Sequence, residues 1–289
     1  MKQAPLIKLI ILICLLISFP TLAAPVGESA GEIWIDGPEE TQPGTTPSKP
    51  DAAVDKTGRS IFVWAANPAV NGGSDIYLRI FPADGGAPSE PVRVNTLLLN
   101  SQRYPRVAFG SDDSFLVIWQ SNEVPDGGVN EKELVRSQAF DANAQAVGSE
   151  QLLSTLSTDT VYPVFADVAA LRDGGYVVVW RSGKTSGDDP NASIQARRID
   201  ADGVPLAEQF QVNSTTENSQ DFSSVTELSD GRFFVVWGKP EVRGRRFDAD
   251  GTPDGDDFQI NTSTVGSQFE TDVLQHQDGR VLALWKDDE

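Results

Sequence analysis

Two acidic turns of the form D-A-D-G carry side chains that could bind a metal ion. Their four carboxylates belong to Asp200, Asp202, Asp248 and Asp250. Calcium takes about six to eight oxygen ligands, often from carboxylates two positions apart. The residue after each glycine, Val204 or Thr252, is not an acid, and Asp and Gly also suit a hairpin turn without a metal. The pattern favours a turn and leaves calcium as the alternative; no other cofactor is expected.

Long polar loops carry a second group of acids. They read NPAVNGGSD, SNEVPDGGVNEKE and SGKTSGDDPN, and each comes shortly after a tryptophan. Loops on a rigid scaffold frequently carry function, and in a repeat these three would share one rim. The candidate ligands for a cation or a sugar hydroxyl are Asp75, Asp126, Asp188 and Asp189. Solvated loops without a ligand are the alternative.

Other catalytic motifs are excluded by their context. The string GESAG at residues 27–31 matches G-x-S-x-G, but a nucleophile elbow needs a strand before the serine and a helix after it. Ser29 lies instead in an expected flexible tail. His276 is the only histidine and Cys14 the only cysteine, which is too few for a zinc site built on these residues. His276 is predicted to face solvent on a strand.

The elements that position these residues form a repeat. Five apolar runs, such as DGRFFVVW, follow a turn and end on Trp64, Trp119, Trp180, Trp237 and Trp285. A run that is apolar at every position is typical of a strand buried on both faces, so these tryptophans are expected in the core rather than exposed for sugar stacking. A more polar strand follows the first four runs. Its arginines Arg79, Arg197 and Arg245 are predicted to form an exposed ladder rather than a sialidase-like site.

The period of the repeat predicts the fold. The polar residue that ends the third element recurs as Asp36, Asn95, Ser154, Asn213 and Asn261, in steps of 59, 59, 59 and 48 residues. Four short strands per unit predict an all-β fold, a β-propeller of about five four-stranded units. A β-sandwich or a row of small β-domains is the alternative. The string EIWID matches the third element, so residues 33–36 are predicted to join the last unit and close the ring. An incomplete larger propeller is the rival.

The first residues are typical of an export signal. Lys2 and Lys8 precede an apolar stretch at residues 9–19, and small residues around Ala23 suit a cleavage site. The stretch is shorter than the roughly 20 residues that span a bilayer. We expect a signal peptide at 1–23, a flexible tail at 24–31 and a repeat domain at 32–289. The chain would be secreted or periplasmic, without membrane insertion after cleavage. Bulky neighbours of Cys14 argue against a lipid anchor.

The charge excludes one class of partner. The chain holds 23 basic and 42 acidic residues, a formal net charge of −19. Removing Lys2 and Lys8 with the signal makes the charge −21. Such a surface repels nucleic-acid phosphates and anionic lipid, so no nucleic-acid partner is expected.

The repeat strings resemble those of a known group of proteins. DGRFFVVW, VRGRRFDADG and DFQIN, with DGGYVVVW, IQARRIDADG and EQFQVN, resemble the DGGFVVVW, AQRFDADG and EFQVN units of secreted bacterial repeat proteins. Those units look like propeller blades and are distantly similar to the integrin α-subunit head. The resemblance covers residues 32–289 and implies an extracellular, adhesin-like or calcium-associated protein. The three-aspartate calcium loop of integrin-type repeats is missing here.

The expected function is that of a secreted, non-enzymatic β-propeller, an extracellular binding or scaffold module for a glycan or a protein. The alternative is a glycan-active enzyme, a hydrolase or lyase, with its site on the loop rim or in the channel. Convergent carboxylates with a raised pKa would mark the enzyme, and no such pair is evident in the sequence.

Overall fold

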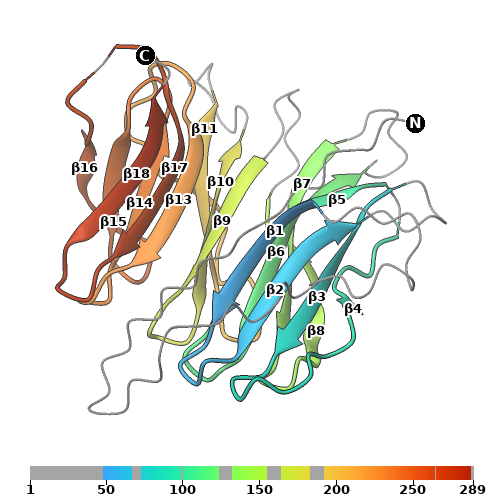
Figure 1. Cartoon of the computed structure of the whole chain (residues 1–289). Helices are drawn as coiled ribbons and strands as arrows, with labels where there is room; N and C mark the ends of the chain where they lie inside the picture. Colours follow the sequence, from blue (N-terminus) through green and yellow to red (C-terminus); the bar gives the residue numbers. More distant parts are fainter. Residues whose placement is uncertain are drawn as a thin grey trace, which may run out of the picture. The chain divides into compact units, whose positions relative to one another are not determined.

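The computed structural model describes residues 48–66, 73–98, 100–123, 132–154, 164–182, 192–263 and 265–287. In these ranges every regular element is a β-strand, and all sheets are antiparallel (Figure 1). None of the described residues forms a helix that is long and apolar enough to cross a membrane. The predicted signal, Ser29 and the predicted strand at residues 33–36 lie outside the described residues.

The strands form consecutive sheets in chain order. The first sheet contains β1 (Ser48–Val54), β2 (Ser60–Ala66), β3 (Asp75–Phe81) and β4 (Val92–Arg93). The second contains β5 (Gln102–Phe109), β6 (Phe115–Glu123), β7 (Lys132–Phe140) and β8 (Ala146–Leu152). The third contains β9 (Val164–Ala170), β10 (Tyr176–Ser182), β11 (Ser193–Ile199) and β12 (Phe210–Gln211). The fourth contains β13 (Asp221–Glu227), β14 (Phe233–Gly238), β15 (Arg243–Phe247) and β16 (Pro253–Gln259). Among the described residues the fifth has two strands, β17 (Gln268–Gln275) and β18 (Val281–Asp287). The predicted four-stranded unit is therefore confirmed in four consecutive repeats.

The second strand of a unit is apolar throughout because it packs on both sides. In β6, Val117 belongs to the core shared with the first sheet, whereas its neighbour Ile118 belongs to the core shared with the third. Successive side chains of a strand point to opposite faces, so both positions must be apolar. The predicted burial is confirmed for four tryptophans, which are at most 2% exposed: Trp64, Trp119, Trp180 and Trp237.

The fifth tryptophan differs from the expectation. Trp285 on β18 is 38% exposed, and Leu284 before it is 60% exposed. Within the described residues β17 is the only sheet partner of β18, and no later sheet covers it. A strand buries both faces only between two sheets, so the apolar run of the last unit stays half open.

The polar residue that defines the period closes each unit. In the third unit, Asn213 Oδ1 accepts a hydrogen bond from the Ile194 N–H at 2.9 Å. The equivalent acceptors, each nineteen residues after its donor, are Asn95, Ser154 and Asn261. An unpaired buried N–H costs roughly 1–3 kcal/mol, so this position needs a polar side chain.

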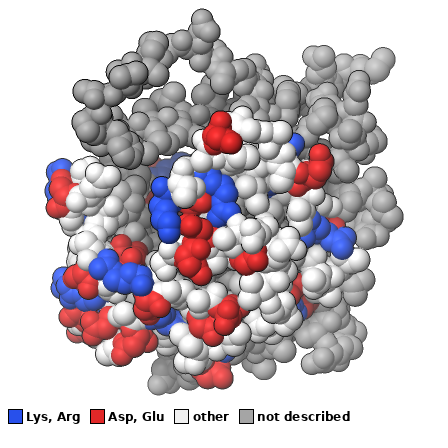
Figure 2. Space-filling view, turned by 90° about the horizontal axis from the view of Figure 1, so that it is seen from below, with Lys and Arg blue, Asp and Glu red and all other residues white. Residues whose placement is uncertain are grey.

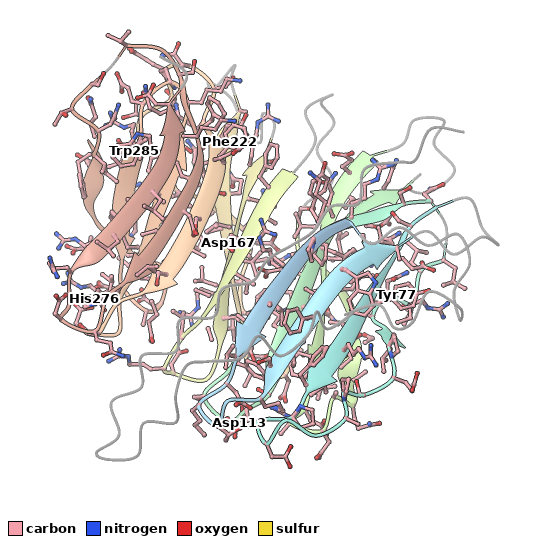
Figure 3. The ribbon with its side chains drawn as sticks, in the orientation of Figure 1. Tyr77, Asp113, Asp167, Phe222, His276 and Trp285 are labelled. Carbon is pink, nitrogen blue, oxygen red and sulfur yellow. The ribbon has the colours of Figure 1, made fainter. Side chains whose placement is uncertain are left out.

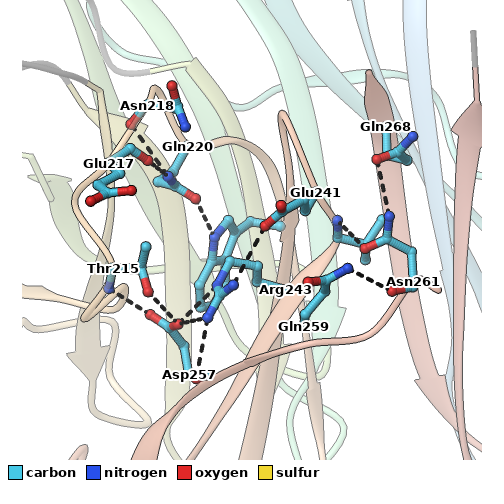
Figure 4. A network of polar contacts seen from close by, with 12 residues as sticks. Thr215, Glu217, Asn218, Gln220, Glu241, Arg243, Asp257, Gln259, Asn261 and Gln268 are labelled. Atoms are coloured by element: carbon cyan, nitrogen blue, oxygen red, sulfur yellow. Dashed lines mark hydrogen bonds and ion pairs between the residues drawn. The ribbon is translucent and has the colours of Figure 1, made fainter. Parts of the chain in front are cut away.

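An acid on an outermost strand ties two units together (Figure 4). Asp257 on β16 accepts hydrogen bonds from the N–H groups of Ser214 and Thr215 at 2.7 and 2.8 Å. It also pairs with Arg243 at 2.6 Å. Burial alone raises the pKa of Asp257, but the Thr215 N–H and the Arg243 guanidinium outweigh it and lower that pKa to about 2. The connection between the third and fourth sheets is therefore held by an ionised carboxylate.

Candidate functional site

One position of the first strand brings side chains from all five units together. On each first strand a bulge interrupts the ladder to the second strand, and the next paired residue is Asp51, Arg106, Asp167, Ser224 or Asp272. Each of them lies thirteen positions before the tryptophan of its unit. The first strands of successive sheets lie against one another, as β9, β13 and β17 do in Figure 1, so these positions converge. We call these five residues the inner cluster.

Hydrogen bonds connect the third, fourth and fifth units within the inner cluster. Ser224 Oγ lies 2.8 Å from Asp167 Oδ2 and 3.2 Å from Asp272 Oδ1. Because both carboxylate oxygens contact the same hydroxyl oxygen, they can lie no further apart than the 6.0 Å to which these distances add up. Asp167 Oδ2 also accepts the N–H of Val225 at 2.9 Å. Two carboxylates therefore face each other across one serine.

Asp51 joins the inner cluster from the first unit. Its Oδ2 accepts a hydrogen bond from the Val107 N–H at 3.0 Å, next to Arg106 on β5. The positive charge of Arg106 acts on both Asp51 and Asp167, and the carboxylate of Asp272 acts on Asp51. The cluster therefore holds three acids around one cation.

Burial raises the pKa of both Asp51 and Asp167. For each carboxyl, the loss of surrounding water is the largest effect, and Arg106 and a backbone N–H oppose it. Neighbouring carboxylates add to the rise, since Asp272 raises the pKa of Asp51 and Asp51 raises that of Asp167. This is how a protein keeps a carboxylic acid protonated closer to neutral pH, so that it can donate a proton.

The inner cluster lies away from the hairpin turns. Figure 3 shows Asp167 partway along β9, with Phe222 toward one end of the sheets and Asp113 and His276 at the other. The hairpin-turn end, seen in Figure 2, carries acidic and basic side chains next to each other rather than a continuous basic surface. Ion pairs such as that between Lys56 and Asp113, at 3.3 Å, account for this pattern.

The four predicted calcium ligands lie in hairpin turns, Asp200 and Asp202 between β11 and β12, and Asp248 and Asp250 between β15 and β16. Asp200 Oδ1 accepts the N–H of Val204 at 2.7 Å, and Asp250 Oδ1 accepts the N–H of Thr252 at 2.8 Å. These carboxylates hold their own turns, as the turn interpretation expects. In the part of the chain that the structure describes, no three His, Cys, Asp or Glu residues are grouped to hold a metal ion.

Of the acids predicted on the loop rim, only Asp75 lies among the described residues. Asp75 is 5% exposed, and it accepts a hydrogen bond from Asn95 Nδ2 at 2.8 Å, so its carboxylate serves the first unit. Asp126, Asp188 and Asp189 lie outside the described residues.

Two smaller expectations can be compared with the structure. The repeated arginines on the third strands are half-buried instead of forming an exposed ladder. Each donates a hydrogen bond to a backbone carbonyl ten residues later in the chain. Their acceptors are the carbonyls of Ser89 for Arg79, Ala207 for Arg197 and Gly255 for Arg245, at 2.6, 2.7 and 2.8 Å. His276 follows directly after β17, and its side chain is 51% exposed.

Sequence reasoning missed the inner cluster. Its members are three aspartates, an arginine and a serine, so no residue type is common to all five positions and they form no motif. The available signal was their constant thirteen-residue distance from the tryptophans. That distance marks equivalent positions, but it does not show that these positions meet in space.

Comparisons with known proteins agree with the architecture. No family model and no curated protein matches the sequence. Among solved structures, a protein of unknown function from Dyadobacter fermentans has a similar fold, with a TM-score of 0.58 and 14% identity over 84% of this chain and 75% of that one. An α-L-arabinofuranosidase from Fusarium graminearum, in complex with an iminosugar inhibitor, gives 0.54 and 13% over 80% and 68%. An α-L-arabinanase from Penicillium chrysogenum, complexed with arabinobiose, gives 0.53 and 15% over 80% and 72%. The predicted all-β propeller architecture is confirmed.

The expected non-enzymatic function is wrong in the light of these findings. Two of the three structures named above are an α-L-arabinofuranosidase and an α-L-arabinanase. Convergent carboxylates with a raised pKa, the feature that would mark an enzyme, are present as Asp51 and Asp167. The alternative, a glycan-active enzyme, is better supported, and the candidate site described above lies on the inner strands.

Proposed function

We propose that this chain is a glycoside hydrolase with Asp167 and Asp272 as its catalytic groups. The observation that carries the proposal is their shared contact with Ser224 Oγ, together with the raised pKa of Asp167. Glycosidic bonds are commonly cleaved by two such carboxyl groups, one protonated and one ionised. The likeness to an arabinofuranosidase and an arabinanase supports an arabinose-containing glycan as the substrate.

Each group has a role that its surroundings favour. Asp167, whose pKa is raised by burial, gives its proton to the glycosidic oxygen while the bond from that oxygen to the anomeric carbon breaks. The bonding electrons leave with the oxygen, and the exposed carboxylate of Asp272 forms a bond to the anomeric carbon. Water then releases the sugar, with ionised Asp167 taking the proton from that water. The charges of Asp51 and Arg106 act on Asp167 in opposite directions, since Asp51 raises its pKa and Arg106 lowers it.

The separation of the carboxylates favours one stereochemical outcome. Their contacting oxygens lie at most 6.0 Å apart, by the two distances to Ser224. Inverting pairs need about 6.5–9.5 Å to admit a water, whereas retaining pairs need about 5–5.5 Å. We expect the anomeric configuration to be retained. The signal-like N-terminus supports action outside the cytoplasm, where the enzyme would encounter polymeric glycans.

Hydrolysis of an aryl α-L-arabinofuranoside, of arabinan and of a panel of other neutral glycans tests the proposal. Asp167→Asn and Asp272→Asn are expected to lower kcat/KM by about a thousandfold, with folding checked by circular dichroism. Asp113→Asn is the control, because it lies at the hairpin-turn end and its φ of +67° suits Asn. Proton NMR of the first product reports its configuration. An inactive parent, or inner-cluster variants that keep full activity, would overturn the assignment.

A further inference from the structure

A row of aromatic side chains lies two residues before the inner-cluster positions of three units and three residues before that of a fourth. Tyr104, Phe165 and Phe222 occupy this equivalent position in the second, third and fourth units, and Phe269 continues the row in the fifth. Neighbouring ring centroids lie 6.5 Å apart for Tyr104 and Phe165, 4.6 Å for Phe165 and Phe222, and 6.0 Å for Phe222 and Phe269. We call these four residues the aromatic arc. It crosses four sheets at the end where β2, β6 and β10 terminate, as the label of Phe222 shows in Figure 3.

The backbone beneath the aromatic arc adopts a costly conformation. The φ angles of Tyr104, Phe165 and Phe222 are +51°, +54° and +53°, in a region that bulky side chains rarely adopt. The equivalent residues Lys49 and Glu270 have φ angles of +53° as well. Glycine would adopt this conformation without a side-chain clash, yet three units carry an aromatic ring. Bulges of this kind redirect side chains and are common beside active sites.

Packing in the core does not account for the aromatic arc. None of its members belongs to the hydrophobic clusters formed between the sheets in the described residues. Phe165 is 40% exposed, although it sits in the middle of the row. Lysine ammonium groups lie against the two outer rings, Lys49 at 5.4 Å from Tyr104 and Lys286 at 4.9 Å from Phe269. The rings thus form an apolar surface with polar ends.

We propose that the aromatic arc is a binding surface on which a neutral glycan stacks as it approaches the inner cluster. The negative face of an aromatic ring attracts the weakly positive C–H groups on the apolar face of a sugar. The hydroxyls at the sugar edge then meet the inner cluster, which begins two residues further along the strand in the second, third and fourth units. Binding sites of this type combine aromatic walls with a few placed polar groups. The proposal rests on the proposed function for what happens after binding, but not for binding itself.

Calorimetric titration with arabinohexaose, xylohexaose and cellohexaose tests the proposal in the full mature chain carrying Asp167→Asn, so that no ligand is consumed. Phe165→Leu keeps an apolar side chain but removes the ring face. Its dissociation constant for the bound oligosaccharide is expected to rise roughly tenfold. Phe258→Leu is the matched control, since Phe258 is 49% exposed and lies on the outermost strand β16. Phe165→Gly, which suits the positive φ, gives a second variant that should stay folded and lose the same affinity.

The outcomes separate this proposal from the catalytic one. Unchanged affinity in both Phe165 variants, or no binding of any of the three oligosaccharides, would overturn the aromatic arc as a glycan surface. If the parent hydrolyses glycans while Phe165→Leu keeps its KM, the hydrolase stands and the binding surface fails. If the parent binds through Phe165 without hydrolysing anything, the binding surface stands and the hydrolase fails.

Discussion

The aspartates of this chain show how surroundings divide one residue type between opposite tasks. Asp257 has two backbone N–H groups and an arginine as partners, so its charged form is favoured and its pKa falls to about 2. Asp167 is buried with fewer donors and with carboxylates nearby, so its neutral form is favoured and its pKa rises. Asp257 is suited to holding structure, and Asp167 is suited to moving a proton.

These opposite shifts predict opposite effects on stability. The raised pKa of Asp167 means that the folded chain binds its proton more tightly than the unfolded chain, where 3.8 is the ordinary value. The stability from this group is therefore present below about 3.8 and is lost as the pH rises through the folded pKa. The amide oxygen of Asp167→Asn can still accept the Val225 N–H. At neutral pH the free energy of unfolding of this variant is expected to be at least that of the parent. Between acid and neutral pH it should fall less than the parent's does. Urea unfolding across that pH range measures both.

Asp257→Asn serves as the matched comparison. Its lowered pKa contributes stability that is present above about 3.8 and is lost as the pH falls toward about 2. Removing the charge takes away the carboxylate that pairs with Arg243 at 2.6 Å. We expect the free energy of unfolding to fall by about 3 kcal/mol at neutral pH. Equal responses of the two variants to pH would contradict the opposite environments inferred for their carboxylates.

At the scale of elements, the second strand of each unit depends on having a sheet on either side. Trp237 on β14 is fully buried, and its indole N–H donates to Gln220 Oε1 at 2.7 Å. Trp285 occupies the same position on β18 and is 38% exposed. The two residues have the same local sequence context but different surroundings.

Replacing these two tryptophans by alanine separates local pattern from packing. Trp237→Ala should lower the free energy of unfolding by roughly 3–5 kcal/mol, because it leaves a cavity and removes the hydrogen-bond donor to the buried Gln220 Oε1. Trp285→Ala should cost clearly less, because less apolar surface is withdrawn from water in the native state. Denaturant unfolding of both variants measures the difference. Equal losses would mean that β18 is covered as fully as β14.

At the scale of the whole molecule, the apolar surface that β18 exposes within the described residues is the feature that needs an explanation. Val281, Leu282, Leu284 and Trp285 are each between 38% and 60% exposed. An exposed apolar edge strand invites pairing with another chain. The predicted partner from this chain, residues 33–36, lies outside the described residues, and closure by it stays a prediction.

Deletion of residues 24–37 tests closure. If residues 33–36 pair with β18, the shortened chain should bind more apolar dye, and the β18 amides should exchange hydrogen faster than in the parent. Amides of β10, which lies in a four-stranded sheet, provide the internal reference. Unchanged exchange in β18 would show that the N-terminal segment does not cover it.

The sequence by itself determined the repeat, the strands and most of the core. A strand between two sheets must be apolar at every position, so the runs before Trp119, Trp180 and Trp237 reveal burial without any knowledge of the fold. The turns were readable for a similar reason, since Asp and Gly act on neighbouring backbone groups. Both kinds of signal are local, and local interactions are what a sequence pattern records.

Only the tertiary structure decided where chemistry could occur. Asp51, Asp167 and Asp272 are separated by more than a hundred residues in each case, and nothing in their local sequence tells that the first strands lie together. The raised pKa values of Asp51 and Asp167 depend on burial and on neighbouring carboxylates, which are properties of the assembled sheets. The same holds for the aromatic arc, since Phe165 and Phe222 become neighbours only when successive units pack. Sequence patterns record what one strand needs, whereas this site arises where strands from separate units meet.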